Sequence, residues 1–129
     1  MKALIDTHVF LWVITAPEKL SQTALQIIES KANDIFLSPA SCWEIVIKYQ
    51  VNKLDLSENP DNLILEQIKE SEIKILPITV EHTLNILNLP LFHKDPFDRL
   101  LISQALVENL PIITYDSIIR KYEGVNVIW

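Results

Sequence analysis

The chain has 129 residues, of which 49% are hydrophobic, and its formal net charge is -6. This length and composition predict one globular domain over residues 1–129, with a core that needs no disulfide. The single cysteine, Cys42, excludes an intramolecular disulfide, and the three histidines are too few and too scattered for a Cys/His zinc cage. The net negative charge is opposite in sign to the basic surface with which proteins usually bind nucleic acid.

Two further exclusions come from single residues. The only glycine, Gly124, excludes a glycine-rich dinucleotide fingerprint and a phosphate-binding P-loop. Asp6 and His8 interrupt the apolar run near the start before it can form the core of a signal peptide. No apolar stretch is long enough to span a membrane. We therefore expect a soluble, cytoplasmic protein.

Short apolar runs alternate with amphipathic segments along the chain. The runs 3–5, 35–37, 73–76, 112–114 and 125–128 predict strands covered on both faces. Strands that alternate with helices favour an α/β sandwich on a parallel sheet. Capping residues and first-turn prolines predict helices from Ser21 to Glu29, from Ser38-Pro39 to Gln50, from Asn59-Pro60, from Thr79, and from Asp95-Pro96 to Glu108.

Four acids stand at or near the boundaries of these elements. Asp6 directly follows the first strand, and Asp116 lies just past the fourth. Glu44 lies among apolar residues of the helix from Ser38, and Asp98 lies in the first turn of the helix after Asp95-Pro96. Sites in open parallel sheets form beyond the carboxyl ends of strands, where the strand order reverses. If the first and fourth strands are neighbours, Asp6 and Asp116 meet.

A cluster of carboxylates suits a hard divalent cation. The like charges repel one another, and a bound cation reverses the sign of that interaction. Oxygen ligands favour Mg²⁺ or Mn²⁺ over zinc, and a pair of such ions roughly 4 Å apart can activate water and stabilise the leaving oxygen of a phosphodiester. No nucleophile–base pair in the sequence suggests a covalent mechanism.

Each acid also has a structural interpretation. Asp95 is best explained as the cap of the helix that begins at Pro96. Asp98 could complement the dipole of that helix, and Glu44 could pair with Lys48 one helical turn on. The remaining alternatives are a cap at Asp6 for a helix beginning at Thr7 and an ordinary turn residue at Asp116.

At these residues the sequence resembles the PIN-domain ribonucleases, and specifically the VapC-like toxins of toxin–antitoxin pairs. The resemblance spans nearly the whole chain and is most specific in its third block. The four blocks are Leu4-Ile5-Asp6-Thr7-His8-Val9-Phe10-Leu11-Trp12, Ser38-Pro39-Ala40-Ser41-Cys42-Trp43-Glu44-Ile45, His93-Lys94-Asp95-Pro96-Phe97-Asp98-Arg99-Leu100-Leu101-Ile102 with Gln104-Ala105, and Thr114-Tyr115-Asp116.

The resemblance implies a three-layer α/β/α sandwich and a Mg²⁺- or Mn²⁺-dependent endoribonuclease. It also implies homodimerisation and inhibition by a cognate antitoxin protein. Thr114 would support an acid through its hydroxyl, and Thr7 would lie near the site. The metal-binding acids would be Asp6, Glu44, Asp98 and Asp116.

The net charge of -6 conflicts with an RNA substrate, but four of those negative charges would belong to the site. Two bound divalent ions would make the site locally positive. We expect Lys48 and Arg99 to contact substrate phosphate, with a helix-surface salt bridge as the alternative for Arg99. The remaining acidity favours selective RNA cleavage and a basic protein partner.

Three rival functions remain open at this stage. A metal-dependent phosphatase or hydrolase of small molecules would also use Asp6. A phosphoaspartate mechanism usually requires a second aspartate two residues later, where this chain has His8. A receiver-like signalling module would need adjacent N-terminal acids and a late lysine. An interaction domain without activity would be recognised by the loss of metal binding.

Overall fold

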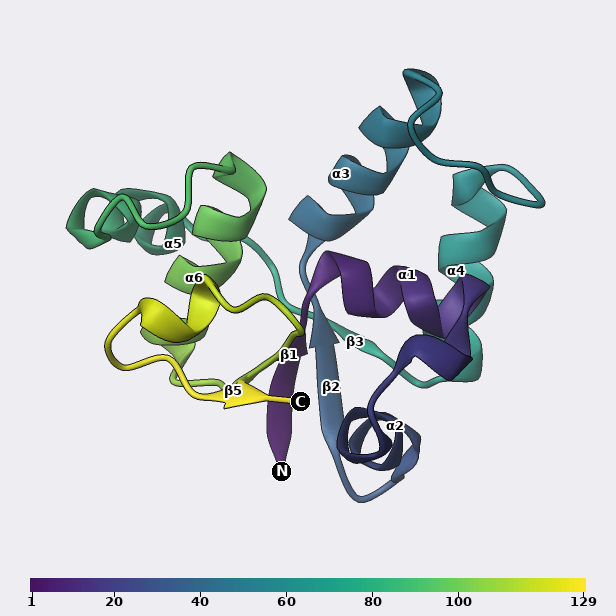
Figure 1. The fold of residues 1–129 in the computed structure, drawn as a ribbon, viewed down its shortest axis with the longest axis horizontal. Coiled ribbons are helices and arrows are strands. Elements are labelled where there is room, and N and C mark those ends of the chain that lie inside the picture. Colours follow the sequence, from purple (N-terminus) through teal and green to yellow (C-terminus); the bar gives the residue numbers. More distant parts are fainter.

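The computed structural model describes residues 1–129 and contains one sheet of five parallel strands. The strand order is β3-β2-β1-β4-β5, so the first strand lies at the centre of the sheet (Figure 1). Leu4 in the central strand is in register with Phe36 on one side and Ile112 on the other. The last three strands are shorter than predicted. The strands are β1 (Lys2–Ile5), β2 (Asp34–Leu37), β3 (Lys74–Ile75), β4 (Ile112–Ile113) and β5 (Val127–Ile128).

Six α-helices connect and cover the strands. The hydroxyls of Ser21, Ser38 and Thr79 and the carboxylate of Asp95 accept backbone N–H groups, which confirms four of the predicted helix starts. Asn59 occupies the fifth cap position without a side-chain hydrogen bond. The helices are α1 (Thr7–Thr15), α2 (Gln22–Glu29), α3 (Pro39–Gln50), α4 (Pro60–Glu70), α5 (Val80–Leu84) and α6 (Pro96–Glu108), with short 3-10 helices at Pro17–Lys19, Asn85–Asn88 and Ile119–Lys121.

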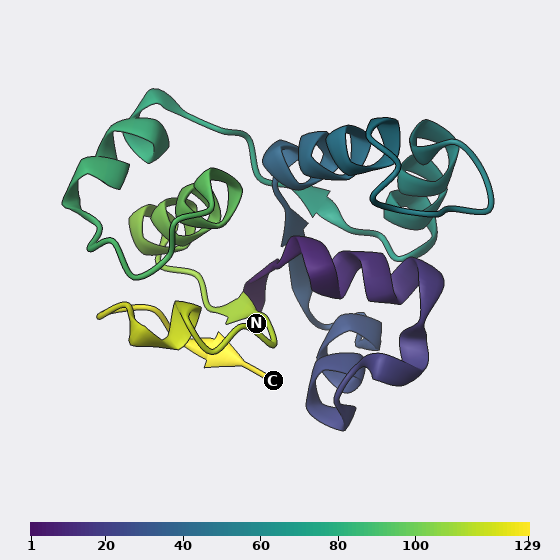
Figure 2. The same cartoon turned by 45° about the horizontal axis from the view of Figure 1, so that its top comes forward.

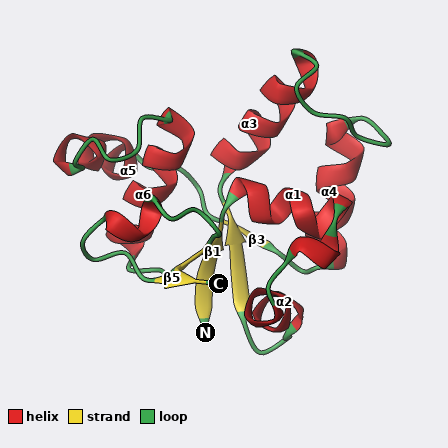
Figure 3. Ribbon diagram, in the orientation of Figure 1, coloured by secondary structure: helices red, strands yellow, loops and turns green.

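The two faces of the sheet carry separate hydrophobic cores. Because side chains alternate along a strand, Ala3 and Ile5 pack against α1 and α2, whereas Leu4 packs against α6. Figure 2 shows α1 and α2 on one side of the strands and α6 on the other, and Figure 3 shows the strands enclosed between helices. This arrangement confirms the expected three-layer α/β/α sandwich around a parallel sheet.

The strand order reverses between the neighbouring strands β1 and β4. From β1 the chain builds β2 and β3 toward one edge of the sheet, and later returns to place β4 and β5 on the other side. The N–H group of Asp6 donates to the carbonyl of Ile113 at 3.0 Å, which ties the end of β1 to the end of β4. The sequence argument that Asp6 and Asp116 lie at adjacent strand ends therefore holds.

None of the helices combines the length and the apolar character that a crossing of the bilayer requires.

Candidate metal centre

Asp6 is buried at the end of β1, with 3% of its surface exposed. Its Oδ2 atom accepts a hydrogen bond from the Thr114 hydroxyl at 2.7 Å, while its Oδ1 atom is buried without a partner. Although Asp6 occupies the cap position of α1, its side chain makes no capping hydrogen bond, so the structural alternative does not account for it. Burial raises the pKa of Asp6, and the Thr114 hydroxyl opposes that shift.

Thr114 connects two of the acids. Its hydroxyl donates to Asp6 and accepts the backbone N–H of Asp116 at 3.0 Å. Thr7 is also buried next to Asp6, but its hydroxyl donates to the hydroxyl of Ser41 at 2.8 Å. That bond joins α1 to α3 and makes no contact with a carboxylate.

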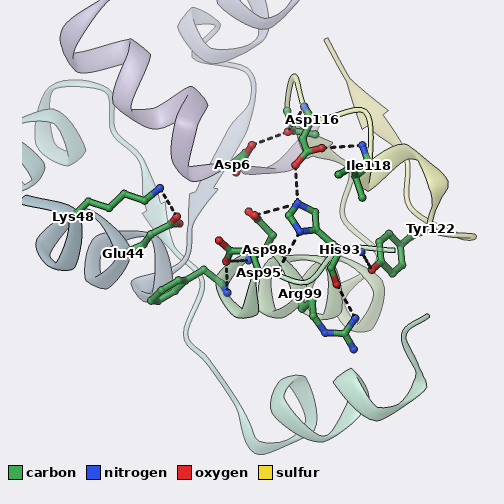
Figure 4. A network of polar contacts seen from close by, with 12 residues as sticks. Asp6, Glu44, Lys48, His93, Asp95, Asp98, Arg99, Asp116, Ile118 and Tyr122 are labelled. Carbon is green, nitrogen blue, oxygen red and sulfur yellow. Dashed lines mark hydrogen bonds and ion pairs between the residues drawn. The ribbon is translucent and has the colours of Figure 1, made fainter. Parts of the chain in front are cut away.

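Glu44 projects from α3 and is also buried, with 5% of its side chain exposed. Its Oε2 atom lies 2.8 Å from Nζ of Lys48, and its Oε1 atom is buried without a hydrogen-bond partner. The Glu44–Lys48 pair that we weighed as a structural alternative is therefore present, but the acid is enclosed by protein instead of solvated. The side chain of Lys48 is one-third exposed and points to Glu44 (Figure 4).

Asp98 and Asp116 share one histidine, His93, from the loop before α6. Its Nε2 atom lies 3.2 Å from Oδ2 of Asp98 and 2.8 Å from Oδ2 of Asp116 (Figure 4). The other oxygen of Asp116 accepts the N–H of Ile118 at 2.8 Å. One potential ligand atom from each of His93, Asp98 and Asp116 lies within 4.8 Å of the others.

Sequence reasoning missed His93, because the three histidines were judged only as zinc ligands and found scattered. The available signal was the position of His93 two residues before Asp95, in the block that carries Asp98. Its ring also lies close to the backbone of this block, since the N–H of Asp95 donates to Nδ1 at 3.4 Å.

The acids act on one another electrostatically. The pKa of Asp98 is raised to about 7, first by burial and then by the charges of Asp6, Asp95 and Glu44, with His93 opposing the shift. The charge of Asp116 likewise raises the pKa of Asp6. Ionising the whole group is therefore costly unless a cation joins it.

The donor set fits a hard divalent cation. All four acids offer carboxylate oxygens, and two of those oxygens, on Asp6 and Glu44, are buried with no protein partner. A buried carboxylate oxygen without a donor is unfavourable by itself and becomes favourable when it ligates a cation. The arrangement can thus hold a divalent metal at the switch point of the sheet.

Asp95 caps α6. Its Oδ1 atom accepts the N–H groups of Phe97 at 2.8 Å and of Asp98 at 3.3 Å, as expected for a residue before Pro96. The cap orders the first helical turn and thereby fixes the backbone of Asp98.

Arg99 makes no ion pair, so the surface salt bridge that we weighed for it is wrong. The expected contact of its guanidinium with substrate phosphate stays a prediction. The guanidinium donates instead to four backbone carbonyls of the preceding segment, at distances of 2.9 to 3.4 Å. Figure 4 shows it on the side of α6 away from Asp6. Its carbonyl partners belong to Ile86, Leu89, Pro90 and His93.

Comparison with known proteins gives matches over nearly the whole chain. The sequence model of the PIN domain matches residues 3–125. Ribonuclease VapC22 of Mycobacterium tuberculosis is 28% identical over 120 residues, which cover 92% of this chain and 90% of that protein.

Solved structures share the fold over nearly the whole chain. VapBC2 from Rickettsia felis, bound to a DNA fragment from their promoter, aligns with a TM-score of 0.74 and 18% identity over 99% of this chain and 98% of that chain. DNA-bound VapBC from Salmonella typhimurium aligns with a TM-score of 0.71 and 13% identity over 99% of this chain and 97% of that chain.

Proposed function

This chain belongs to the PIN-domain family, and on that premise we propose that it is a metal-dependent endoribonuclease, the toxin of a toxin–antitoxin pair. The observation that carries the proposal is the pair of buried, unpartnered carboxylate oxygens on Asp6 and Glu44, together with Asp98 and Asp116, which share the ring of His93. The similarity to a protein named as a ribonuclease supports RNA as the substrate.

In this proposal Asp6, Glu44, Asp98 and Asp116 hold Mg²⁺ or Mn²⁺. The bound ion supplies an activated water and offsets the charge that develops on the phosphodiester. Thr114 orients Asp6 and the backbone of Asp116, so that the two strand ends present their carboxylates together.

The other candidate residues hold the acids and their backbone in position. Lys48 neutralises Glu44 and, being partly exposed, is the side chain best placed to approach a substrate phosphate. Asp95 and Arg99 act on the backbone, because they fix the start of α6 and the loop that carries His93. Thr7 joins α1 to α3, the helix that carries Glu44.

The proposed partners follow from the family and from charge. Two similar structures are VapBC complexes, which supports a cognate antitoxin for this chain. The homodimer is proposed from the resemblance of the sequence blocks alone. A net charge of -6 favours a basic antitoxin segment, because charge complementarity steers association and selects partners. Cellular RNA as the substrate would support the cytoplasm as the place where this protein acts.

The test compares substrates of two classes. Purified protein is incubated with total cellular RNA and with p-nitrophenyl phosphate, each with Mg²⁺, with Mn²⁺ and with EDTA. We expect internal cleavage of RNA that EDTA abolishes, no turnover of p-nitrophenyl phosphate, and arrest of growth when a bacterial host produces the protein alone. Turnover of p-nitrophenyl phosphate without RNA cleavage would instead establish the phosphatase alternative.

A further inference from the structure

Every polar atom of His93 has a partner. Its N–H group donates to the hydroxyl oxygen of Tyr122 at 2.8 Å, and its carbonyl accepts from the guanidinium of Arg99 at 3.2 Å. In the ring, Nδ1 accepts the N–H of Asp95 at 3.4 Å, and Nε2 lies against the two acids described above. The backbone and the ring of His93 are therefore fixed by different groups.

The hydroxyl of Tyr122 bonds to the loop before α6 at two points. It accepts the N–H of His93 and donates to the carbonyl of Pro90, each at 2.8 Å. Figure 4 shows the tyrosine beside His93, on the side away from Asp6. The residue is only 2% exposed, and its ring packs among the apolar side chains on the α6 face of the sheet. A ring fixed in the core thus presents its hydroxyl to the loop.

Packing gives the middle of this loop little support. Residues 89–95 form no helix or strand between the 3-10 helix that follows α5 and the start of α6. Leu91 is 77% exposed and Phe92 is 50% exposed. An exposed segment without regular backbone hydrogen bonds opens easily unless side chains from elsewhere hold it. The position of His93 therefore depends on the hydrogen bonds to its own backbone.

Tyr122 and Asp116 are the two ends of one short segment. Oδ1 of Asp116 accepts the N–H of Ile118, and Tyr122 directly follows the 3-10 helix Ile119–Lys121. Asp116 contacts the ring of His93, while Tyr122 contacts its backbone. The segment and His93 thus form a closed circuit of contacts, and loss of the tyrosine hydroxyl would open it.

Burial alone explains only one of the two bonds of Tyr122. A buried tyrosine usually finds some partner for its hydroxyl, and the carbonyl of Pro90 would serve that purpose. That carbonyl also accepts from Arg99 at 2.9 Å, so the loop does not depend on Tyr122 at this point. The N–H of His93, in contrast, donates to the hydroxyl of Tyr122 alone.

We propose that Tyr122 is a positioning residue, whose hydroxyl holds the backbone of His93 so that the ring stays against Asp98 and Asp116. There the ring competes with a divalent cation for the two carboxylates, and Tyr122 thereby limits how readily the acids bind metal. This inference rests on the proposed metal-dependent function, because the competition matters only if these acids bind a cation.

The experiment follows the histidine rings by NMR in protein with ¹³C-labelled histidine. The chain has three histidines, and His8→Ala and His93→Ala assign their signals by elimination. In EDTA, Tyr122→Phe should move the signal of His93. The signal of His82, a buried ring on α5, should stay in place and report that the variant is folded.

Titration of the same samples with Mg²⁺ measures the competition. The signal of His93 should move as Mg²⁺ is added to the wild type, and the midpoint gives an apparent Kd. In Tyr122→Phe the midpoint should fall roughly two- to tenfold, the range that corresponds to the loss of one hydrogen bond. Tyr49→Phe, in a tyrosine of α3 whose hydroxyl contacts Asn59, is the matched control and should keep the wild-type midpoint.

Two further measurements separate positioning from packing. The rise in melting temperature on adding Mg²⁺ should be the same in the double variant Tyr122→Phe/His93→Ala as in His93→Ala, because Tyr122 acts through the ring that both lack. In the wild type, which needs no substitution to fold, the N–H of His93 should exchange with D₂O more slowly than that of Phe92, which has no acceptor.

The proposal is overturned if the signal of His93 does not move in Tyr122→Phe, or if the Mg²⁺ midpoint stays the same or rises. Additive effects in the double variant, or exchange at His93 as fast as at Phe92, also overturn it. If the wild type neither responds to Mg²⁺ nor cleaves RNA, the proposed function fails. The comparison in EDTA then still decides whether Tyr122 positions His93.

Discussion

The Nε2 atom of His93 lies 2.8 Å from Oδ2 of Asp116, so a ring that enters from the loop before α6 contacts an acid from the loop after β4. The same nitrogen lies 3.2 Å from Asp98. His93 therefore bridges two acids whose like charges repel, and it occupies a position that a cation could also use.

The first prediction concerns this bridge. His93→Ala removes the donor that Asp98 and Asp116 share, so the protein in EDTA should lose about 1–3 kcal/mol of stability. A divalent ion then replaces the lost contact, and the rise in melting temperature on adding Mg²⁺ should exceed that of the wild type. Thermal denaturation with and without Mg²⁺ measures both effects. A smaller rise than in the wild type would instead make His93 a metal ligand.

The second prediction concerns pH. Because the pKa of Asp98 rises from 3.8 to about 7 on folding, the folded protein binds more protons than the unfolded chain between those values. Stability in EDTA should therefore fall as pH rises through this window, and the raised pKa of Asp6 acts in the same direction.

A divalent ion prefers the ionised carboxylates, so Mg²⁺ should stabilise the protein much more at about pH 8 than at about pH 5. Urea denaturation at the two pH values, with Mg²⁺ or EDTA, checks this expectation. Asp98→Asn should flatten the pH dependence in EDTA. A wild-type stability in EDTA that increases from pH 5 to pH 8 would contradict the raised pKa of Asp98 and the repulsion among the acids that contributes to it.

The third prediction separates two acids that lie three residues apart. Asp95→Asn keeps a side-chain oxygen that can cap α6, so most activity should remain. Asp98→Asn removes a charge from the cluster and should abolish nearly all cleavage. The measurement compares the initial rates of RNA cleavage by the two variants, after their melting temperatures have been shown to be equal. Equal losses would show that Asp95 also serves the reaction.

The fourth prediction concerns Arg99. Lysine keeps the charge but cannot reach four carbonyls with its single nitrogen, so Arg99→Lys should cost roughly 2–3 kcal/mol of stability through the loop that carries His93. Metal affinity, measured by calorimetry, should change little. If the variant keeps the stability of the wild type and loses much of its RNA affinity, Arg99 contacts substrate phosphate, as the sequence suggested.

Much of the site could be predicted because local rules determine it. An acid after a buried parallel strand points to the carboxyl edge of the sheet, and the neighbouring positions of β1 and β4 bring Asp6 toward Asp116. The cap at Asp95 follows from the proline after it.

The remaining features depend on the path of the chain between α5 and α6. Only that path brings His93 to the acids and places carbonyls of residues 86–93 around the guanidinium of Arg99. A long side chain reaches many positions, and its own sequence neighbours do not determine which one it takes. The sequence indicates α1 only as a helix beginning at Thr7 that Asp6 could cap. Its central residues, from Val9 to Ile14, are all apolar, so no alternation of polar and apolar faces indicates a helix there.

The most direct test of the central claim measures metal-dependent RNA cleavage in single-acid variants. Asp6→Asn, Glu44→Gln, Asp98→Asn and Asp116→Asn are compared with Asp61→Asn, a control in an exposed acid of α4. We predict that the wild type and Asp61→Asn cleave RNA with Mg²⁺ or Mn²⁺ and not with EDTA, and that each of the four site variants loses nearly all cleavage. Cleavage that persists in EDTA, or that survives in Asp6→Asn, would contradict the account.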